Sequence, residues 1–339
     1  MMLPPQPPRL SLARLPTPLQ ALDRISAQLE AERGGEPLRI WVKRDDLTGS
    51  VLSGNKVRKL EFTLAQALEE GCKTIITCGG LQSNHCRATA LLCAQLGLRC
   101  HLILRGEPEG DADGNLLLDH LAGARIDYYR TKDYQANLDR YLSEAKDKHD
   151  ADGMPAFIIP TGASDGIGVW GYLSACEELK RDFRDAGIAP QHIVCATGSG
   201  GTQAGLTLGA QLMALEAAVW GVNVCDDEQW FLKKVRQDID DWAERYQPDF
   251  DAGSLDTRVI DGYVGPGYAI ADQEVFETIA MLGRMEGLVL DPVYTGKAFH
   301  GMLCEIRNGR FDGASDIVFV HTGGSFGLFP QRGGFATIL

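Results

Sequence analysis

Residues 192–202, with the sequence His-Ile-Val-Cys-Ala-Thr-Gly-Ser-Gly-Gly-Thr, contain an apolar run, a glycine-rich loop and the start of a helix. The apolar run His192–Ala196 has the length and composition of a strand that is buried on both faces. A helix predicted over Thr202–Leu215 follows the loop directly. This order of strand, loop and helix is typical of a parallel sheet covered by helices.

The same alternation recurs along most of the chain, with a helix predicted between most successive strands. Further strands are predicted at Leu38–Lys43, Thr74–Cys78, Cys100–Arg105, Arg125–Tyr129, Ala156–Ile159, Ala218–Val224 and Ile317–His321. A helix is also predicted over Leu19–Leu29, because Thr17 and Pro18 suit an N-cap and a first helical position. We therefore expect an α/β fold with two doubly wound, mostly parallel sheets flanked by helices, and ligands at the carboxyl ends of the strands.

Composition limits the classes of partner. The 339 residues include 33 Lys and Arg against 46 Asp and Glu, a net charge of −13, which argues against nucleic acid or an anionic membrane as the partner. Nine scattered cysteines favour reduced, buried thiols over a disulfide framework, and no group has the spacing of metal ligands. With no signal-peptide core and no apolar run of membrane-spanning length, we expect a soluble, cytoplasmic protein without a metal.

The loop within residues 192–202 is predicted to bind a phosphate group. Its glycines let backbone N–H groups turn towards a ligand, while Ser199 and Thr202 add hydroxyl donors. A P-loop is excluded because no Gly-Lys-Ser/Thr follows, and Gln203 replaces the third glycine of the dinucleotide fingerprint. A tight turn with no ligand remains the alternative. We call residues 198–202 the phosphate cup.

A basic segment earlier in the chain contains a candidate nucleophile. Residues 53–59, Ser-Gly-Asn-Lys-Val-Arg-Lys, place three cations in the first turn of a predicted helix, where the helix dipole disfavours them. Crowding of like charges should depress the pKa of Lys56 and make its amine nucleophilic. Lys56 is therefore a candidate to form a Schiff base, and a solvated basic helix start is the alternative.

Three more loops follow strands or precede helices. Ser83, Asn84 and His85, which we call the carboxylate cradle, combine free backbone N–H groups with polar side chains, although a plain N-cap is the alternative. In residues 290–297, Tyr294 and Thr295 are not needed for helix entry. Two further glycine-rich segments, residues 265–268 and 321–325, could equally serve packing alone.

A reactive lysine, a cup for one phosphate and a carboxylate cradle together indicate pyridoxal 5′-phosphate and an amino-acid substrate. At this point the chain resembles the family of D-cysteine desulfhydrase and 1-aminocyclopropane-1-carboxylate (ACC) deaminase, enzymes of fold type II. The resemblance extends over residues 15–329. Its motifs are residues 54–61 (GNKVRKLE), 82–85 (QSNH), 198–202 (GSGGT), 291–297 (DPVYTGK) and 321–324 (HTGG).

The resemblance implies a role for each of these motifs. Lys56 would carry the Schiff base and be catalytic, together with Ser83, Tyr268 and Tyr294. The substrate would contact Ser83, Asn84, His85, Tyr268 and Tyr294. The cofactor would contact Lys56, Lys59, Asn84 (at its 3-hydroxyl), Gly198, Ser199, Gly200, Gly201, Thr202, Thr295 and Thr322. A large domain of residues 1–59 and 171–339, a small domain of residues 60–170 and a homodimer are also implied.

Two positions distinguish the activities within the family. ACC deaminases have a glutamate where this chain has Thr295 and a leucine where it has Thr322. A glutamate near the pyridine nitrogen keeps it protonated and deepens the electron sink, whereas a threonine can only hydrogen-bond to it. A shallow sink suits β-elimination, because the departing sulfur takes the electrons at once.

The resulting hypothesis is a lyase of sulfur and D-amino-acid metabolism that converts D-cysteine to pyruvate, ammonia and hydrogen sulfide. Elimination of sulfite from L-cysteate is the nearest alternative, although it would need a further anion-binding group. ACC deamination is a minor alternative. A non-catalytic cofactor-binding protein and a nicotinamide dehydrogenase are disfavoured by the intact lysine and by the incomplete fingerprint.

Overall fold

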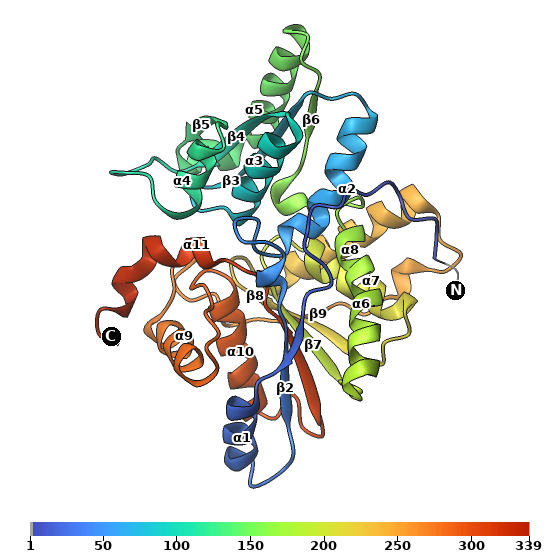
Figure 1. Ribbon diagram of the computed structural model, residues 1–339, viewed down its shortest axis with the longest axis vertical. Coiled ribbons are helices and arrows are strands. Elements are labelled where there is room, and N and C mark those ends of the chain that lie inside the picture. Colours follow the sequence, from blue (N-terminus) through green and yellow to red (C-terminus); the bar gives the residue numbers. More distant parts are fainter. Residues whose placement is uncertain (1–2, 339) are drawn as a thin grey trace.

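The computed structural model describes residues 3–338, which form two sheets with helices packed on their faces (Figure 1). The larger sheet has six strands in the order β1-β2-β10-β7-β8-β9. All neighbouring strands are parallel except β1 and β2. The strands are β1 (Leu19–Ala21), β2 (Arg39–Lys43), β10 (Asp316–Val320), β7 (His192–Thr197), β8 (Ala218–Asn223) and β9 (Arg258–Ile260).

The smaller sheet has four parallel strands in the order β5-β4-β3-β6. They are β5 (Arg125–Tyr129), β4 (Arg99–Arg105), β3 (Thr74–Gly80) and β6 (Ala156–Ile158). The α/β class with two mostly parallel sheets flanked by helices is thereby confirmed. We propose to keep the division into residues 1–59 with 171–339 and residues 60–170, although its first cut falls inside a helix, α2 (Lys56–Glu69).

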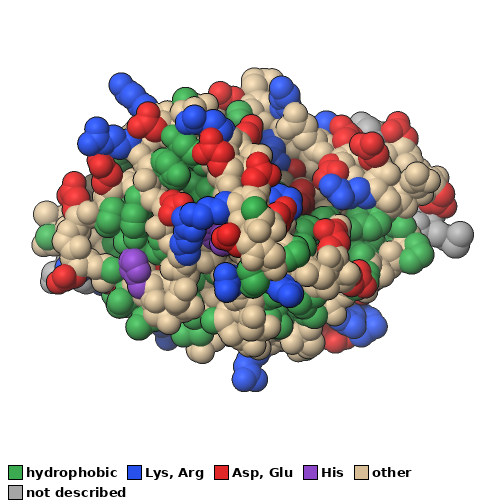
Figure 2. All heavy atoms as spheres, turned by 90° about the horizontal axis from the view of Figure 1, so that it is seen from above, with side chains coloured by type: hydrophobic (Ala, Val, Ile, Leu, Met, Phe, Trp, Pro, Cys, Tyr) green, Lys and Arg blue, Asp and Glu red, His purple; other side chains and the backbone are tan. Residues whose placement is uncertain are grey.

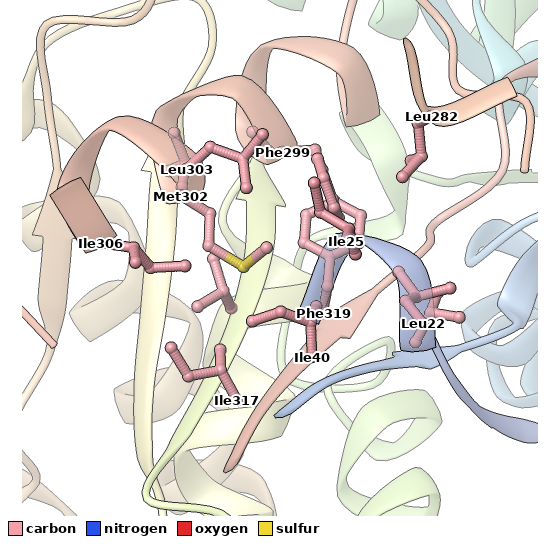
Figure 3. Packing of buried hydrophobic residues seen from close by; sticks show 14 of the residues in the cluster. Leu22, Ile25, Ile40, Leu282, Phe299, Met302, Leu303, Ile306, Ile317 and Phe319 are labelled. Atoms are coloured by element: carbon pink, nitrogen blue, oxygen red, sulfur yellow. The ribbon is translucent and has the colours of Figure 1, made fainter. Parts of the chain in front are cut away.

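Helices cover both faces of the larger sheet. On one face α1 (Asp23–Glu32), α9 (Gln273–Glu286) and α10 (Thr295–Arg307) enclose a core in which Phe299, Met302 and Ile306 pack against Ile317 and Phe319 (Figure 3). The other face is covered by α6 (Trp170–Ala186), α7 (Gly201–Leu212) and α8 (Glu228–Tyr246). The smaller sheet is flanked by α3 (Asn84–Leu96), α4 (Gly114–Leu121) and α5 (Thr131–Ala151), and α11 (Ser325–Leu328) lies near the C-terminus.

Two details differ from the sequence-based prediction. Residues 19–21 form strand β1, antiparallel to β2, and α1 begins only at Asp23, so the helix predicted from Leu19 was wrong at its start. Strand β9 at the opposite edge was not predicted. Both are three-residue edge strands, whose pairing depends on backbone groups offered by a distant neighbour and not on their own sequence.

The charges at one end of the molecule are mixed in sign, and the cysteines are unpaired. Figure 2 looks onto the end of the molecule that carries the smaller sheet, where acidic and basic side chains alternate and neither sign dominates. All nine cysteines are free thiols. Within residues 3–338 no helix is both long and apolar enough to cross a bilayer.

Candidate active site

A cavity of about 580 Å³ lies where the carboxyl ends of β3, β4 and β7 converge, between the two sheets. It brings together most of the residues that the sequence singled out. The residues from the prediction that line it are Lys56, Ser83, Asn84, His85, Gly198, Ser199, Gly200, Thr202, Tyr268, Tyr294 and Thr322. Lys59, Gly201 and Thr295 are not part of its wall.

Lys56 is placed by close contact between two loops. Gly54 has φ +116°, and a Cβ there would lie 2.7 Å from the carbonyl oxygen of Thr322. A Cβ on Gly323 would lie 2.6 Å from the Cα of Gly54, so glycine is required at both positions. The backbone N–H of Asn55 donates to the Thr322 carbonyl at 3.1 Å. Lys56 therefore starts α2 directly beside the loop that follows β10.

The pKa of Lys56 is lowered, as the sequence predicts, but the cause is not the crowding of like charges. Burial, which removes water from the ammonium, lowers the pKa of Lys56 to about 8. Arg58 contributes nothing to this shift, because its guanidinium is held by Asp45 and Glu178. Within residues 3–338 the Lys56 ammonium has no hydrogen bond or ion pair, so it is free to react.

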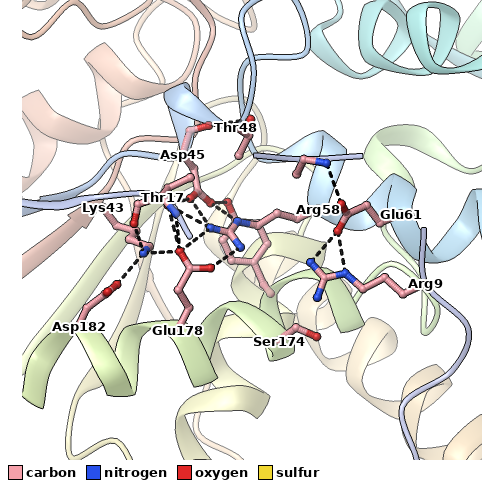
Figure 4. A network of polar contacts seen from close by, with 12 residues as sticks. Arg9, Thr17, Lys43, Asp45, Thr48, Arg58, Glu61, Ser174, Glu178 and Asp182 are labelled. Carbon is pink, nitrogen blue, oxygen red and sulfur yellow. Dashed lines mark hydrogen bonds and ion pairs between the residues drawn. The ribbon is translucent and has the colours of Figure 1, made fainter. Parts of the chain in front are cut away.

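A buried network of charged side chains fixes the helix that carries Lys56 (Figure 4). Arg58 on α2 bonds Asp45 at 2.7 Å and Glu178 of α6 at 3.1 Å. Lys43 of β2 donates to the same Glu178 at 2.5 Å, and Tyr172 donates to Asp45 at 2.5 Å. Arg58, the second cation of the basic first turn, thus points away from the cavity and into this network.

The phosphate cup is completed by a serine from another segment. The Ser164 hydroxyl lies 2.8 Å from the Ser199 hydroxyl, accepts from the backbone N–H of Gly201 at 3.2 Å and receives Lys59 Nζ at 3.3 Å. A Cβ on Gly201 would lie 2.7 Å from this Ser164 oxygen, so the backbone must be bare there. Burial, followed by the Lys56 charge, lowers the pKa of Lys59 well below its usual value.

The carboxylate cradle combines a helix cap with an unpaired imidazole nitrogen. Ser83 caps α3 by accepting from the Cys86 N–H at 3.2 Å, so the N-cap interpretation holds although Ser83 also lines the cavity. Asn84 Oδ1 accepts from Asn115 at 3.0 Å. His85 Nε2 lies 2.8 Å from the Thr77 hydroxyl, while its buried Nδ1 has no partner among the described residues. Burial, and then Lys56 and Lys59, keep the pKa of His85 low and its ring neutral.

Tyr268 and Tyr294 form a pair across the cavity. Their hydroxyls are 2.7 Å apart, and burial raises the pKa of both phenols. The Tyr294 ring packs on the phosphate cup, because a Cβ on Gly198 would come within 3.0 Å of it. Lys297 of α10 donates to the carbonyls of Val264 and Gly267 and thereby holds the loop that ends in Tyr268.

The two threonines that were expected to discriminate between activities lie in different surroundings. Thr322 lines the cavity. Thr295 is fully buried, donates to Asp291 Oδ1 at 2.7 Å and accepts from the Asp291 N–H at 2.9 Å. The structure therefore does not bring Thr295 into the cavity wall, its hydroxyl is held by Asp291, and its contact with the cofactor stays a prediction.

Several cavity residues were missed by sequence reasoning. Asn55 donates to Thr202 at 2.9 Å and so joins the start of α2 to the phosphate cup. Ser164 completes that cup, and Arg105, Tyr134 and Cys225 also line the wall. Asn55 could have been found from its position beside Lys56. Ser164 and Arg105 carry no such local signal, because their partners are distant in sequence.

Comparison with known proteins identifies the class to which this fold and site belong. Residues 10–323 match the family described as pyridoxal-phosphate dependent enzyme, and the chain belongs to that family. A solved structure described as an ACC deaminase homologue superimposes with a TM-score of 0.87 at 34% identity, covering 98% of this chain and 97% of the other. The fold is thus fold type II, and the cofactor is pyridoxal 5′-phosphate.

Two relatives within the family are similar to this chain over most of its length. A protein of Thermotoga maritima, named provisionally as an ACC deaminase, is 42% identical over 324 residues, or 95% of this chain and 98% of that protein. The mitochondrial bifunctional D-cysteine desulfhydrase/ACC deaminase of Arabidopsis thaliana is 38% identical over 338 residues, or 97% of this chain and 81% of that protein.

The residues present fit this cofactor. The unpaired Lys56 ammonium suits covalent attachment, and the glycine-rich wall at Gly198 and Gly200, with the hydroxyls of Ser199 and Thr202, suits a phosphate. The partnerless His85 Nδ1 is a buried polar atom of the kind that a bound ligand satisfies.

Proposed function

We propose that the protein is a β-elimination lyase that converts D-cysteine to pyruvate, ammonia and hydrogen sulfide. The observation that carries the proposal is the shared cavity, in which Lys56, the carboxylate cradle and the pair Tyr268–Tyr294 lie together. The names of the relatives include both D-cysteine desulfhydrase and ACC deaminase, which supports this pair of activities as the ones to compare. We also propose a cytoplasmic homodimer with roles in sulfur and D-amino-acid metabolism.

We assign the cofactor to the side of the cavity formed by β7 and α7. The phosphate cup would hold its phosphate, with Lys59 acting through Ser164, and Asn84 would contact its 3-hydroxyl. Lys56 would attach it covalently. Bound pyridoxal phosphate supplies the sink for the electrons released at the substrate's α-carbon.

The side chains of the cavity would then bind the substrate carboxylate and transfer the protons of the reaction. The carboxylate cradle holds the substrate carboxylate at the start of α3, where N–H groups and the helix dipole favour an anion. Lys56, neutral above its lowered pKa, removes the α-proton. Tyr268 and Tyr294 stay protonated because burial raises their pKa, so one phenol of the pair can donate a proton to the departing sulfur.

ACC deamination is the second candidate, and one observation favours it. Thr295 was expected to keep the electron sink shallow through contact with the pyridine nitrogen, but its hydroxyl is bonded to Asp291. The argument that Thr295 disfavours opening of the ACC cyclopropane ring is therefore weaker. Elimination of sulfite from L-cysteate remains the nearest alternative with the same bond changes.

A keto-acid assay of the purified holoenzyme tests the proposal on D-cysteine, L-cysteine, L-cysteate and ACC. Pyruvate with sulfide from D-cysteine, at much higher kcat/KM than from the others, is the expected result. Preferred formation of 2-oxobutyrate from ACC, or of sulfite from L-cysteate, would replace it with the corresponding alternative.

Replacement of the candidate nucleophile provides the first variant. Lys56→Ala should abolish both turnover and the absorbance of the covalently bound cofactor, because Lys234, the other lysine among the described residues that line the cavity, is paired with Asp238. Lys148→Ala, at an exposed position on α5, serves as the matched control and should behave as wild type. Turnover that survives in Lys56→Ala would remove Lys56 from the mechanism.

A further inference from the structure

Arg105 is the last residue of β4, and its side chain lines the cavity. In the sheet it stands opposite Gly80, at the end of the neighbouring strand β3. Its guanidinium carbon lies 4.9 Å from the centre of the Tyr268 ring and 5.9 Å from the centre of the Tyr134 ring. The Arg105 side chain, which starts at the end of the smaller sheet, therefore reaches across the cavity to the loop that carries Tyr268.

This cation lacks a counter-ion. Within residues 3–338, the Arg105 side chain makes no hydrogen bond and no ion pair, although it is only partly exposed. Withdrawing a charge from water without a partner is costly, and stacking on an aromatic ring offsets only part of that cost. Arg58, by comparison, is buried but bonded to two carboxylates. An unpaired cation in a ligand cavity is the arrangement expected where the ligand brings the anion.

The two other anionic groups expected in the cavity already have binding groups. The cofactor phosphate has the phosphate cup with Ser164 and Lys59, and the substrate carboxylate has the carboxylate cradle. Arg105 instead stacks on Tyr268, whose hydroxyl meets that of Tyr294. This pair is the one assigned to the substrate's β-carbon. The Arg105 charge also acts to lower the pKa of both Tyr268 and Cys225, which shows that it faces this part of the wall.

We propose that Arg105 binds the anionic sulfur group on the β-carbon of the substrate and stabilises that group as it leaves. This rests on the proposed β-elimination. The α-proton passes to a base, the electron pair of the Cα–H bond forms the Cα–Cβ double bond, and the Cβ–S bond breaks. Sulfur departs with the Cβ–S electron pair. Cysteate releases it as sulfite, and the cysteine thiolate releases it as hydrosulfide after one phenol of the Tyr268–Tyr294 pair has given it a proton, so no oxidant or reductant is needed. The aminoacrylate product hydrolyses to pyruvate and ammonia.

The experiment compares substrates that differ in the group on the β-carbon, with cysteate tested as both enantiomers. Kinetics of the holoenzyme are measured on D-cysteine, D- and L-cysteate, and β-chloro-D-alanine, whose β-substituent is uncharged before it leaves. Arg105→Met removes the cation and keeps a similar length, and Arg105→Lys keeps the charge. Arg140→Met is the matched control, because Arg140 stacks on Tyr141 at 5.1 Å but is exposed on α5.

Arg105→Met should lower kcat/KM for D-cysteine or for cysteate about 10–100-fold, as expected for loss of a charge-assisted hydrogen bond. The value for β-chloro-D-alanine should stay within about threefold, a spread that corresponds to less than one charge-assisted bond. Arg105→Lys should recover part of the loss, and Arg140→Met should match wild type. The substrate whose kcat/KM falls most in Arg105→Met identifies the sulfur group that Arg105 binds, hydrosulfide or sulfite.

Two results would overturn the inference: an equal loss on all substrates, which assigns Arg105 to the α-carboxylate or to folding, and no loss on any. If the wild-type holoenzyme turns over none of these substrates, the proposed elimination is wrong. Equilibrium binding then tests separately whether Arg105 binds the anionic group on the β-carbon. Binding of D-cysteate and D-alanine is then followed through the cofactor absorbance. Arg105→Met should weaken the binding of D-cysteate more than the binding of D-alanine. An unchanged ratio of the two dissociation constants would contradict the assignment.

Discussion

Lys56 illustrates how a single side chain acquires its reactivity from packing. Its ammonium is surrounded by protein that replaces water, so the neutral amine is favoured and its pKa falls to about 8. The neighbouring Arg58 and Lys59 have other tasks: Arg58 anchors α2, and Lys59 reaches Ser164. Of the three cations in this helical turn, Arg58 and Lys59 have partner side chains, whereas Lys56 has none among the described residues.

The lowered pKa predicts how capture of the cofactor depends on pH. Only the neutral amine attacks an aldehyde, so below its pKa the rate of capture by the apoprotein should rise about tenfold per pH unit. The rise should level off near pH 8, the pKa of Lys56. The rate is measured by absorbance after mixing the apoprotein with pyridoxal 5′-phosphate between about pH 6 and about pH 10, a range that brackets this pKa and that of an ordinary lysine.

N-acetyl-lysine methyl ester, measured in parallel, corrects for titration of the cofactor itself. A rate that keeps rising to about pH 10 would mean that Lys56 has the pKa of an exposed lysine. The desolvation argument would then be wrong.

At the scale of the element, helix α10 shows how a helix start positions a side chain of the cavity wall, Tyr294. Asp291 accepts from the backbone N–H groups of Val293, Tyr294 and Thr295 and from the Thr295 hydroxyl, so it caps the helix. Lys297 lies in the first turn, where the helix dipole disfavours a cation. Its ammonium is stabilised instead by the carbonyls of Val264 and Gly267. The helix thereby fixes both tyrosines of the pair.

Lys297→Met should release the loop that carries Tyr268 while leaving the cofactor bound. We expect kcat/KM on D-cysteine to fall about 10–100-fold, since a displacement of about 1 Å can have this effect. Arg307→Met, at the exposed end of the same helix, is the control. A double-mutant cycle with Tyr268→Phe should show strong coupling, and additive losses would show that Lys297 does not act through Tyr268.

At the scale of the whole molecule, the buried network holds the larger sheet, α2 and α6 together. Glu178 accepts from the backbone N–H of Thr17, from Lys43 and from Arg58. Burial alone would raise the pKa of Glu178, but these cations lower it below the usual value, and the same holds for Asp45 with Arg58. Both carboxylates are therefore ionised in the folded protein.

Glu178→Gln should lower the free energy of unfolding by about 3–5 kcal/mol at neutral pH, because it removes the carboxylate that Lys43 and Arg58 share and leaves one carboxylate for each of these buried cations. The exposed neighbour provides the control, and Glu177→Gln should change stability by less than about 0.5 kcal/mol. Urea unfolding measures both. A change in Glu178→Gln no larger than that of the control would show that the network contributes no net stability.

The same network sets a dependence on acid. Because the folded-state pKa of Glu178 and Asp45 is depressed, their contribution is complete above the unfolded values, near pH 4, and is lost as the pH falls through the lower folded values. The difference between wild type and Glu178→Gln should thus shrink below about pH 4. A constant difference across that range would contradict the assignment.

The sequence by itself determined the features that depend on neighbouring residues. Alternating apolar strands and helices predicted the α/β class, and the glycines of residues 198–202 predicted a bare backbone loop, because both follow from local patterns. The candidate lysine and the resemblance were found in the same way. Only the tertiary structure decided what depends on distant partners: the edge strands β1 and β9 and the insertion of Ser164 into the phosphate cup. Arg105 belongs to this second group, because the Tyr268 ring that it contacts comes from another sheet's loop, and no local pattern records whether a cation has a counter-ion.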